Sequence, residues 1–268
     1  MTNKKALSES DICDRYITPA VTTAGWPASQ WRREYGFTDG KIIVRGKLVA
    51  RAKRKRADYL LFHKPNLPIA LIEAKDNNHS VGSGMQQALA YAETLEVPFV
   101  FSSNGDGFLF HDRTGTLPIE QALSLDEFPS PEDLWVRYKK WRVVGEANED
   151  LVTSPNHAEV GGKEARYYQQ LAINRTIEAV ARGEKRLLLA MATGTGKTYT
   201  AFNIIWRLWR NKTAKRVLFL ADRNILVDQT MLNDFRPFKG VMKKLNRSLV
   251  DEHGRVDHPS VLTERYWP

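Results

Sequence analysis

The sequence predicts an α/β protein with two domains, and three observations lead to this prediction. Strand-like segments and helical periods are mixed along the first part of the chain. The stretch 143–162 is rich in polar residues and glycine and has no sustained period, which is typical of a linker. After it, helical and strand patterns alternate as they do in parallel sheets built from βα units. We therefore expect one domain at 1–150 and a second at 151–268.

The composition is that of a packed chain without disulfides. Of 268 residues, 42% are apolar and 26% are charged, as in ordinary globular proteins. The longest clean apolar run, Leu187 to Ala192, is too short to cross a bilayer, so we expect no membrane association. The single cysteine, Cys13, fits a reducing cytoplasm and is expected to be a small buried residue of a helix.

Several elements are expected in the first domain. The period of residues 8–24 predicts a helix that Ser8 or Ser10 caps. Short strands are expected between 34 and 62, with turns at Asp39-Gly40 and Gly46, and Asp58 is expected to open the last of them. The remaining elements are a strand at 69–75, a helix at 84–95, and strands at 99–102 and 107–111.

The second domain is expected to contain the helices 163–182 and 197–210 and the parallel strands 186–192 and 216–221. The net charge of +9 also belongs to this half: residues 1–150 hold 20 basic and 20 acidic residues, and residues 151–268 hold 20 and 11. A basic surface attracts phosphate backbones. Because many basic proteins bind no nucleic acid, the charge only supports other signals.

A glycine loop between the expected strand and helix predicts nucleotide binding. The segment from Met191 to Thr198 reads Met-Ala-Thr-Gly-Thr-Gly-Lys-Thr. Such a loop wraps backbone N–H groups around phosphates, its lysine reaches the β and γ phosphates, and its last threonine binds Mg²⁺. The alternative is an ordinary turn before a helix. The residues expected to bind ATP and its Mg²⁺ are Thr193, Gly194, Thr195, Gly196, Lys197 and Thr198.

With Met191 in place of the usual first glycine, the loop resembles motif I of superfamily 2 helicases and translocases, and in particular their restriction-enzyme branch. The segment 166–173 resembles the adenine-reading Q motif, which implies Gln169 as the reader, although an exposed polar residue of a helix is the alternative. The segment 216–229 resembles motif Ia, which implies DNA-backbone contacts by Arg223 and Gln229, unless it is simply a second strand and loop of the fold.

No acidic Walker B motif or arginine finger follows these motifs, because Asp251-Glu252 does not end an apolar strand. We therefore expect the sequence to be the N-terminal part of a longer polypeptide. On this expectation the isolated piece hydrolyses ATP inefficiently.

A second group of charged residues lies in the first domain. The strand period of two places Glu73 and Lys75 on one face of the strand 69–75, and the preceding strand brings Asp58 beside them. Two carboxylates hold one or two Mg²⁺ ions, and a lysine stabilises charge on a phosphate or orients water. By itself this pattern is also compatible with a surface ion pair.

The arrangement Asp-x(n)-Glu-x-Lys resembles the core of PD-(D/E)xK nucleases, with Ala57 where that family loosely keeps a proline. Gln87 and Tyr91 form an i, i+4 pair that resembles the extra motif of RecB-like nucleases and type I restriction subunits. The resemblance implies Glu9 as a further metal-binding acid, although a helix-dipole acid in the first turn is the alternative.

A basic run lies just before Asp58 and is either a solvated face or a set of DNA-phosphate contacts. Strand alternation allows only half of it to face the site. His63, His79 and His111 lack metal-ligand spacing and are expected to be structural or exposed. The run consists of Arg45, Lys47, Arg51, Lys53, Arg54, Lys55 and Arg56.

Together these motifs are similar to the restriction subunit (HsdR-like) of type I restriction-modification enzymes. The resemblance implies a RecB-like nuclease domain followed by the start of a RecA-like superfamily 2 motor domain. It also implies Mg²⁺, ATP, double-stranded DNA and methyltransferase and specificity subunits as partners. The alternatives are a DNA repair helicase with a fused nuclease-like domain, and a DNA-binding scaffold whose nucleotide loop acts as a switch.

Overall fold

A computed structural model describes residues 3–38, 42–45, 48–51, 54–157, 164–221 and 224–244, and of 42–45, 48–51 and 224–225 the backbone alone. The chain divides into two compact units, Met1–Leu188 and Leu189–Pro268. In the described residues no helix is long and apolar enough to cross a membrane.

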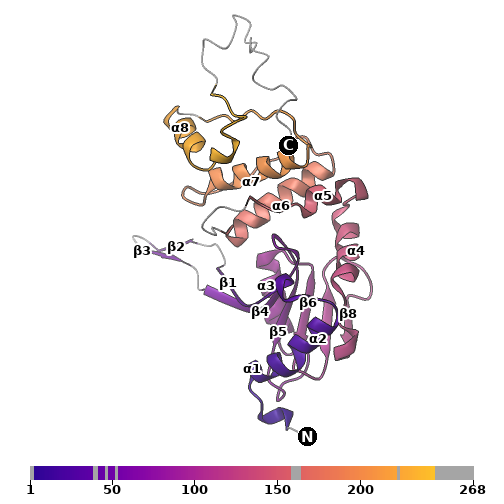
Figure 1. The fold of residues 1–268 in the computed structure, drawn as a ribbon. Coiled ribbons are helices and arrows are strands. Elements are labelled where there is room, and N and C mark those ends of the chain that lie inside the picture. The colour runs from indigo at the N-terminus through magenta and orange to yellow at the C-terminus, as the bar shows by residue number, and fades with distance from the viewer. Residues whose placement is uncertain are drawn as a thin grey trace, which may run out of the picture. The chain divides into compact units, whose positions relative to one another are not determined.

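The first unit is built on a six-stranded sheet in the order β1-β4-β5-β6-β7-β8 (Figure 1). All neighbouring strands are antiparallel except β5 and β6, which are parallel and are connected through α3. A separate antiparallel pair, β2 with β3, lies between β1 and β4 in the chain. The strands are β1 (Trp31–Thr38), β2 (Ile42–Arg45), β3 (Leu48–Arg51), β4 (Arg54–Lys64), β5 (Leu67–Ala74), β6 (Phe99–Ser103), β7 (Phe108–Asp112) and β8 (Glu120–Leu123).

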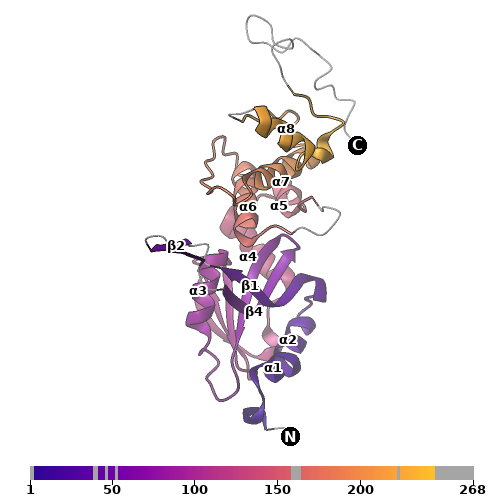
Figure 2. The ribbon, with the colours of Figure 1, turned by 90° about the vertical axis from the view of Figure 1, so that its left-hand side faces the viewer.

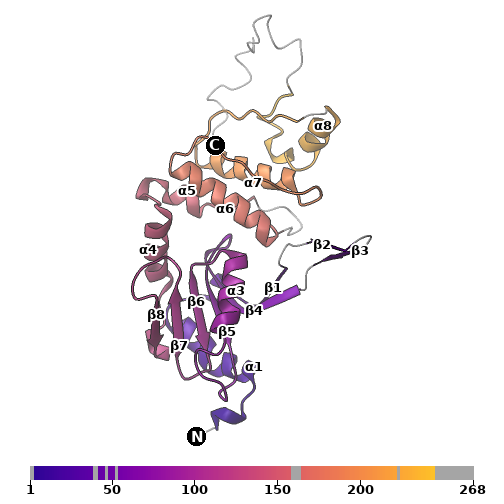
Figure 3. The same cartoon turned by 180° about the vertical axis from the view of Figure 1, so that it is seen from behind.

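Helices cover both faces of this sheet. Figures 2 and 3 show α3 (Met85–Leu95) against one face, and α1 (Glu9–Ile12) and α2 (Thr18–Thr23) on the other. A π-helical turn, Cys13–Ile17, joins α1 to α2, so the expected helix 8–24 is present with an irregular middle. Ser8 caps it in a capping box with Asp11, and Cys13 is buried as expected.

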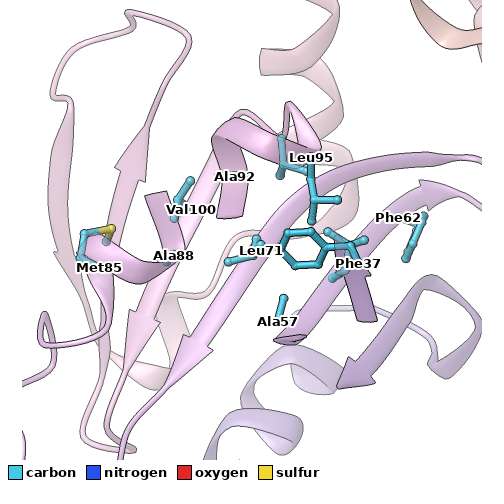
Figure 4. Close-up of a cluster of buried hydrophobic side chains, with 11 residues drawn as sticks. Phe37, Ala57, Phe62, Leu71, Met85, Ala88, Ala92, Leu95 and Val100 are labelled. Carbon is cyan, nitrogen blue, oxygen red and sulfur yellow. The ribbon is translucent and has the colours of Figure 1, made fainter. Parts of the chain in front are cut away.

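The core beneath α3 is aliphatic with a few aromatic rings (Figure 4). The strand period places Val100 under α3 and sends its neighbours Phe99 and Phe101 to the opposite face. On that face the rings of Phe101 and Phe110 stack at a centroid distance of 4.6 Å. The cluster under α3 consists of Phe37, Ala57, Leu60, Phe62, Leu71, Met85, Ala88, Ala92, Leu95, Val97 and Val100.

The helices α4 (Pro131–Arg142), α5 (Glu149–Thr153) and α6 (Tyr167–Ala181) also belong to the first unit. A buried carboxylate, Glu178 on α6, accepts a hydrogen bond from the hydroxyl of Tyr138 on α4 and lies 3.5 Å from Nε of Arg142. Arg175 bridges the same carboxylate, at 3.3 Å, and Glu96 at the end of α3. These contacts hold α6 against α4 and the end of α3 within the first unit.

The second unit contains α7 (Lys197–Arg210), α8 (Asn224–Leu232) and an aromatic cluster centred on Phe202, Phe235 and Phe238. The expectation of a parallel sheet in the second domain is wrong for the described residues, because no strand follows Leu123 in them. The apolar runs 186–192 and 216–221 are irregular, with Leu188 92% and Leu220 80% exposed. A parallel strand depends on neighbours for its hydrogen bonds, and within the part of the chain that the structure describes neither run is paired with one.

One smaller expectation also changes, and another is not tested. Asp58 does not open a strand, because pairing with β1 extends β4 back to Arg54, and Asp58 lies within it. The expected turns at Asp39-Gly40 and Gly46 lie outside the described residues.

Candidate nuclease and nucleotide-binding sites

The pairing of β4 with β5 brings the two expected carboxylates together. Tyr59 is paired with Ile72, so Asp58 and Glu73 are the next residues of the two strands. Oδ2 of Asp58 accepts a 2.7 Å hydrogen bond from the backbone N–H of Ala74. This bond fixes the Asp58 carboxylate at the end of β5, where Glu73 and Lys75 lie.

Glu73 is the centre of the cluster and is only 2% exposed. Its Oε1 accepts hydrogen bonds from Nζ of Lys75, at 3.3 Å, and from Nε2 of Gln87 on α3. Its Oε2 is buried and has no hydrogen-bond partner. A buried carboxylate oxygen without a partner is costly, so this oxygen is the natural ligand for a cation or a water molecule.

The expected helix pair is also present. Nε2 of Gln87 donates to the hydroxyl oxygen of Tyr91 at 3.1 Å, one helical turn further along α3. The same amide group thus contacts both Glu73 and Tyr91. Asp58, Glu73, Lys75, Gln87 and Tyr91, which come from two strands and one helix, form one connected group.

Glu9 belongs to the same surroundings. Its Oε2 lies 3.8 Å from Nζ of Lys75, so the lysine lies within ion-pair distance of two acids. Burial acts to lower the pKa of Lys75, but the carboxylates of Glu73 and Glu9 together outweigh it, and the pKa is raised. Lys75 therefore remains protonated.

The electrostatics of the two carboxylates differ from those of an ordinary surface acid. Burial, followed by the charge of Asp58, raises the pKa of Glu73 to about 8. Burial also raises the pKa of Asp58, against the lowering effect of the Ala74 N–H. The charge of Asp58 therefore opposes ionisation of Glu73, and a cation beside Glu73 would relieve this repulsion.

The donor set fits a hard divalent cation, since Mg²⁺ prefers carboxylate oxygens. Asp58 and Glu73 supply such oxygens, and Oε2 of Glu73 has no hydrogen-bond partner. Within the described residues, however, no three His, Cys, Asp or Glu side chains are grouped closely enough to hold a metal. Glu9 lies against Lys75 and does not complete such a group with Asp58 and Glu73.

Part of the basic run approaches this site. Nζ of Lys55 lies 5.6 Å from the centroid of the Tyr91 ring, whereas Arg56 is exposed and pairs with Glu34 at 3.4 Å. Arg54 is exposed as well. Lys47 and Lys53 lie outside the described residues, as do the side chains of Arg45 and Arg51.

The three histidines singled out in the sequence, His63, His79 and His111, are structural or exposed, as expected. His63 is buried and stacks on the ring of Trp135 at 4.2 Å, and its pKa is lowered to about 4, chiefly by burial. His79 and His111 form hydrogen bonds with Asp76 and Glu120.

The glycine loop leads into α7 as expected, without the strand before it. Gly194 and Gly196 have φ values of +76° and +83°, which other residues rarely adopt. The side chain of Thr195 turns back to the carbonyl of Ala192 at 2.6 Å, and Nζ of Lys197 donates to the carbonyl of Met191 at 3.1 Å. Lys197 and Thr198 begin α7, and Thr193 lies in the turn before it.

The residues expected to read adenine and to contact the DNA backbone lie on either side of this loop in the sequence. Gln169 is 6% exposed, and its Oε1 accepts a 2.9 Å hydrogen bond from the backbone N–H of Arg166, so the side chain caps α6. Adenine recognition by Gln169 remains a prediction. Gln229 is exposed on α8, and Arg223 lies outside the described residues.

Comparison with known proteins shows which family both parts of the chain resemble. The family profile "Type I restriction enzyme R protein N terminus (HSDR_N)" matches residues 27–129, and the profile "Type III restriction enzyme, res subunit" matches residues 162–260. The EcoAI endonuclease subunit of a type I restriction enzyme from Escherichia coli is 52% identical over 252 residues, which are 93% of this chain and 31% of that protein. The chain belongs to the family of type I restriction enzyme R subunits.

Two further relatives of this R-subunit chain are informative. The EcoKI endonuclease subunit from Escherichia coli (strain K12) is 30% identical, over 85% of this chain and 24% of that protein. A solved fragment of an HsdR subunit from Vibrio vulnificus YJ016 superposes with a TM-score of 0.67 at 44% identity, over 77% of this chain and 39% of the fragment. The R-subunit chain thus spans about a quarter to a third of the curated relatives' length.

Some residues that support the carboxylate site could not be recognised from the sequence. The hydroxyl group of Ser102 on β6 accepts the N–H of Gly84 at 3.1 Å and donates to the carbonyl of Val81 at 2.7 Å, which ties the loop before α3 to the sheet. A Cβ atom on Gly84 would lie 3.1 Å from Cγ of Glu73. A serine at a strand end and a glycine before a helix are too common to have been recognised in the sequence.

Proposed function

We propose that this chain supplies the nuclease site and the first nucleotide-binding motif of a type I restriction endonuclease. The observation that carries the proposal is the convergence of Asp58, Glu73 and Lys75, with Gln87 bonded to the central acid. The proposed reaction is Mg²⁺-dependent hydrolysis of phosphodiester bonds in double-stranded DNA. The fold of the first domain on this proposal is that of PD-(D/E)xK nucleases.

The residues divide the work by their chemistry. Asp58 and Glu73 would hold Mg²⁺, which supplies an activated water and neutralises phosphate charge when bound. Gln87 and Lys75 both donate to Oε1 of Glu73, so Oε2 is the oxygen left for the ion. The ammonium group of Lys75 also stabilises negative charge that develops on the scissile phosphate. Tyr91 orients Gln87, and the carboxylates of Glu73 and Glu9 together keep Lys75 protonated.

We further propose that the glycine loop binds ATP. The left-handed glycines and the start of α7 direct backbone N–H groups toward phosphates, and Lys197 and Thr198 provide the cation and the hydroxyl group for the triphosphate and its Mg²⁺. On this proposal, hydrolysis of ATP drives DNA translocation in the complete enzyme. The motor domain proposed for residues 151–268 agrees with the profile match at 162–260.

The remaining parts of the proposal concern the assembly. The curated relatives are endonuclease subunits of type I enzymes, so we propose methyltransferase and specificity subunits as partners and the cytoplasm as the location. The nuclease domain proposed for residues 1–150 contains the profile match at 27–129.

The test is cleavage of a plasmid bearing the recognition site by the full-length polypeptide with its partner subunits, in Mg²⁺, with and without ATP. Wild type is compared with Glu73→Ala and Lys197→Ala. We expect both variants to lose cleavage and only Lys197→Ala to lose ATP hydrolysis. If Glu73→Ala still cleaves, the nuclease assignment is wrong, and the repair helicase with an inactive nuclease-like domain becomes the better explanation.

A further inference from the structure

Phe37, near the end of β1, contacts two tyrosine rings that come from different helices. Its ring centroid lies 5.2 Å from that of Tyr91 on α3, with an interplanar angle of 84°. It lies 6.3 Å from that of Tyr167, the first residue of α6, with an angle of 72°. Both pairs have the edge-to-face geometry that aromatic rings prefer. The three rings connect β1, α3 and α6 within the first unit.

The ring of Tyr91 is the link from this cluster to the carboxylates. The Tyr91 hydroxyl accepts a hydrogen bond from Nε2 of Gln87, which also donates to Oε1 of Glu73. Tyr91 is partly exposed, so its side-chain angle depends on the groups packed against it. Phe37 is 3% exposed and lies in the core beneath α3, beside Leu71 (Figure 4).

We propose that Phe37 is a positioning residue for the nuclease site. Its ring holds Tyr91 in the orientation in which the hydroxyl meets Gln87, and Gln87 in turn holds the Glu73 carboxylate. Tyr167 supports Phe37, so the first turn of α6 contributes to the geometry of the Glu73 carboxylate. The inference rests on the proposed function, since it assigns a role in the same site.

A purely structural role for Phe37 is the competing explanation, because any large residue of the core affects stability. Phe62 provides a matched control. It belongs to the same cluster and is 6% exposed, but its ring pairs with Tyr35, at 6.2 Å. Substitution of either phenylalanine by leucine removes a ring from the same core cluster, but only Phe37→Leu removes the ring that packs against Tyr91.

The experiment compares wild type, Phe37→Leu and Phe62→Leu in the full-length protein with its partner subunits. It measures kcat and KM for plasmid cleavage, ATP hydrolysis, thermal stability, and affinity for Mn²⁺ by electron paramagnetic resonance. For Phe37→Leu we expect kcat to fall about tenfold, as for a small displacement of a catalytic group. KM for DNA and ATP hydrolysis should stay at wild-type values, and Mn²⁺ should bind several-fold more weakly, as expected if the Glu73 carboxylate is less well held.

Phe62→Leu should lower thermal stability comparably and leave kcat and Mn²⁺ affinity near wild type. In addition, Phe37→Leu should have little further effect on kcat in a Tyr91→Phe background, because both changes act through Gln87. Equal kcat and Mn²⁺ affinity in the two leucine variants, or full additivity with Tyr91→Phe, would overturn the inference. Cleavage that persists in Glu73→Ala would instead overturn the proposed function.

Discussion

The backbone N–H of Ala74 donates a 2.7 Å hydrogen bond to the side chain of Asp58, so the acid of one strand is held by the strand that carries the other acid. This bond makes the separation of the two carboxylates a property of the β4·β5 pairing. The loop and helix that follow β5 then add Gln87. Four predictions test this arrangement and its support.

Replacing Gln87 by leucine should lower the rate of DNA cleavage by about tenfold to a hundredfold, because Glu73 loses one of its two donors and its carboxylate is less well placed. Plasmid cleavage under single-turnover conditions measures this rate. The control is Gln86→Leu, since Gln86 is the neighbouring glutamine and is exposed. A similar loss in both variants would show that the helix, rather than the amide of Gln87, matters.

Gly84→Ala should impair the site through crowding alone. The φ of Gly84 is −84°, which suits alanine, but the added Cβ would lie 2.9 Å from Oγ of Ser102 and 3.1 Å from Cγ of Glu73. We expect a loss of about 1–3 kcal/mol in the free energy of unfolding, measured by chemical denaturation, together with slower cleavage. Gly145→Ala is the control, because nothing lies within 4 Å of its Cβ position. Unchanged stability in Gly84→Ala would contradict the close packing described for this loop.

In the absence of divalent metal, the contribution of Glu73 to stability should fall as the pH rises from about 4.5 to about 8. The pKa of His63 is lowered to about 4 and acts in the opposite direction below pH 6.5, so the net fall is expected between about pH 6.5 and about 8. The pKa of Glu73 is raised from 4.5 to about 8, so in this range the folded chain binds a proton that the unfolded chain has released. The Glu73 contribution is therefore greatest below the unfolded value and is lost as the pH rises through the folded value. One such group contributes at most about 1.4 kcal/mol per pH unit.

Thermal melting at several pH values, in the presence of a chelator, measures this dependence. The stability of wild type relative to Glu73→Gln should fall between pH 5 and 8, because the variant lacks the group that titrates. Addition of Mg²⁺ at pH 8 should raise the melting temperature of wild type and not that of Glu73→Gln. A wild-type curve parallel to that of the variant would show that Glu73 ionises without penalty.

Glu178→Ala should destabilise the first unit by about 3 kcal/mol, because it leaves the partly buried guanidinium of Arg142 without its acid and removes the acceptor of the Tyr138 hydroxyl. Chemical denaturation measures this change. Glu184→Ala is the matched control: Glu184 pairs with Arg182 on the surface, and its loss should change stability by no more than about 0.5 kcal/mol. Equal effects would mean that α6 is not held by the buried ion pairs.

The sequence by itself determined the local features of both sites. The period of β5 sets Glu73 and Lys75 on one face, and the helical spacing of Gln87 and Tyr91 sets their hydrogen bond. The glycines of the loop before α7 likewise require φ values that only the local sequence supplies. These features depend on residues a few positions apart, so patterns of spacing reveal them.

Tertiary structure alone decided how these pieces meet. The register of β4 against β5 brings Asp58 to Ala74, the crossover through α3 turns Gln87 toward Glu73, and Phe37 reaches Tyr91 from a distant strand. The apolar runs at 186–192 and 216–221 show the converse, because a strand-like composition does not form a strand without neighbours that complete its hydrogen bonds. Pairing across long sequence separations is decided by the burial and hydrogen bonding of the whole unit, and a local pattern does not contain it.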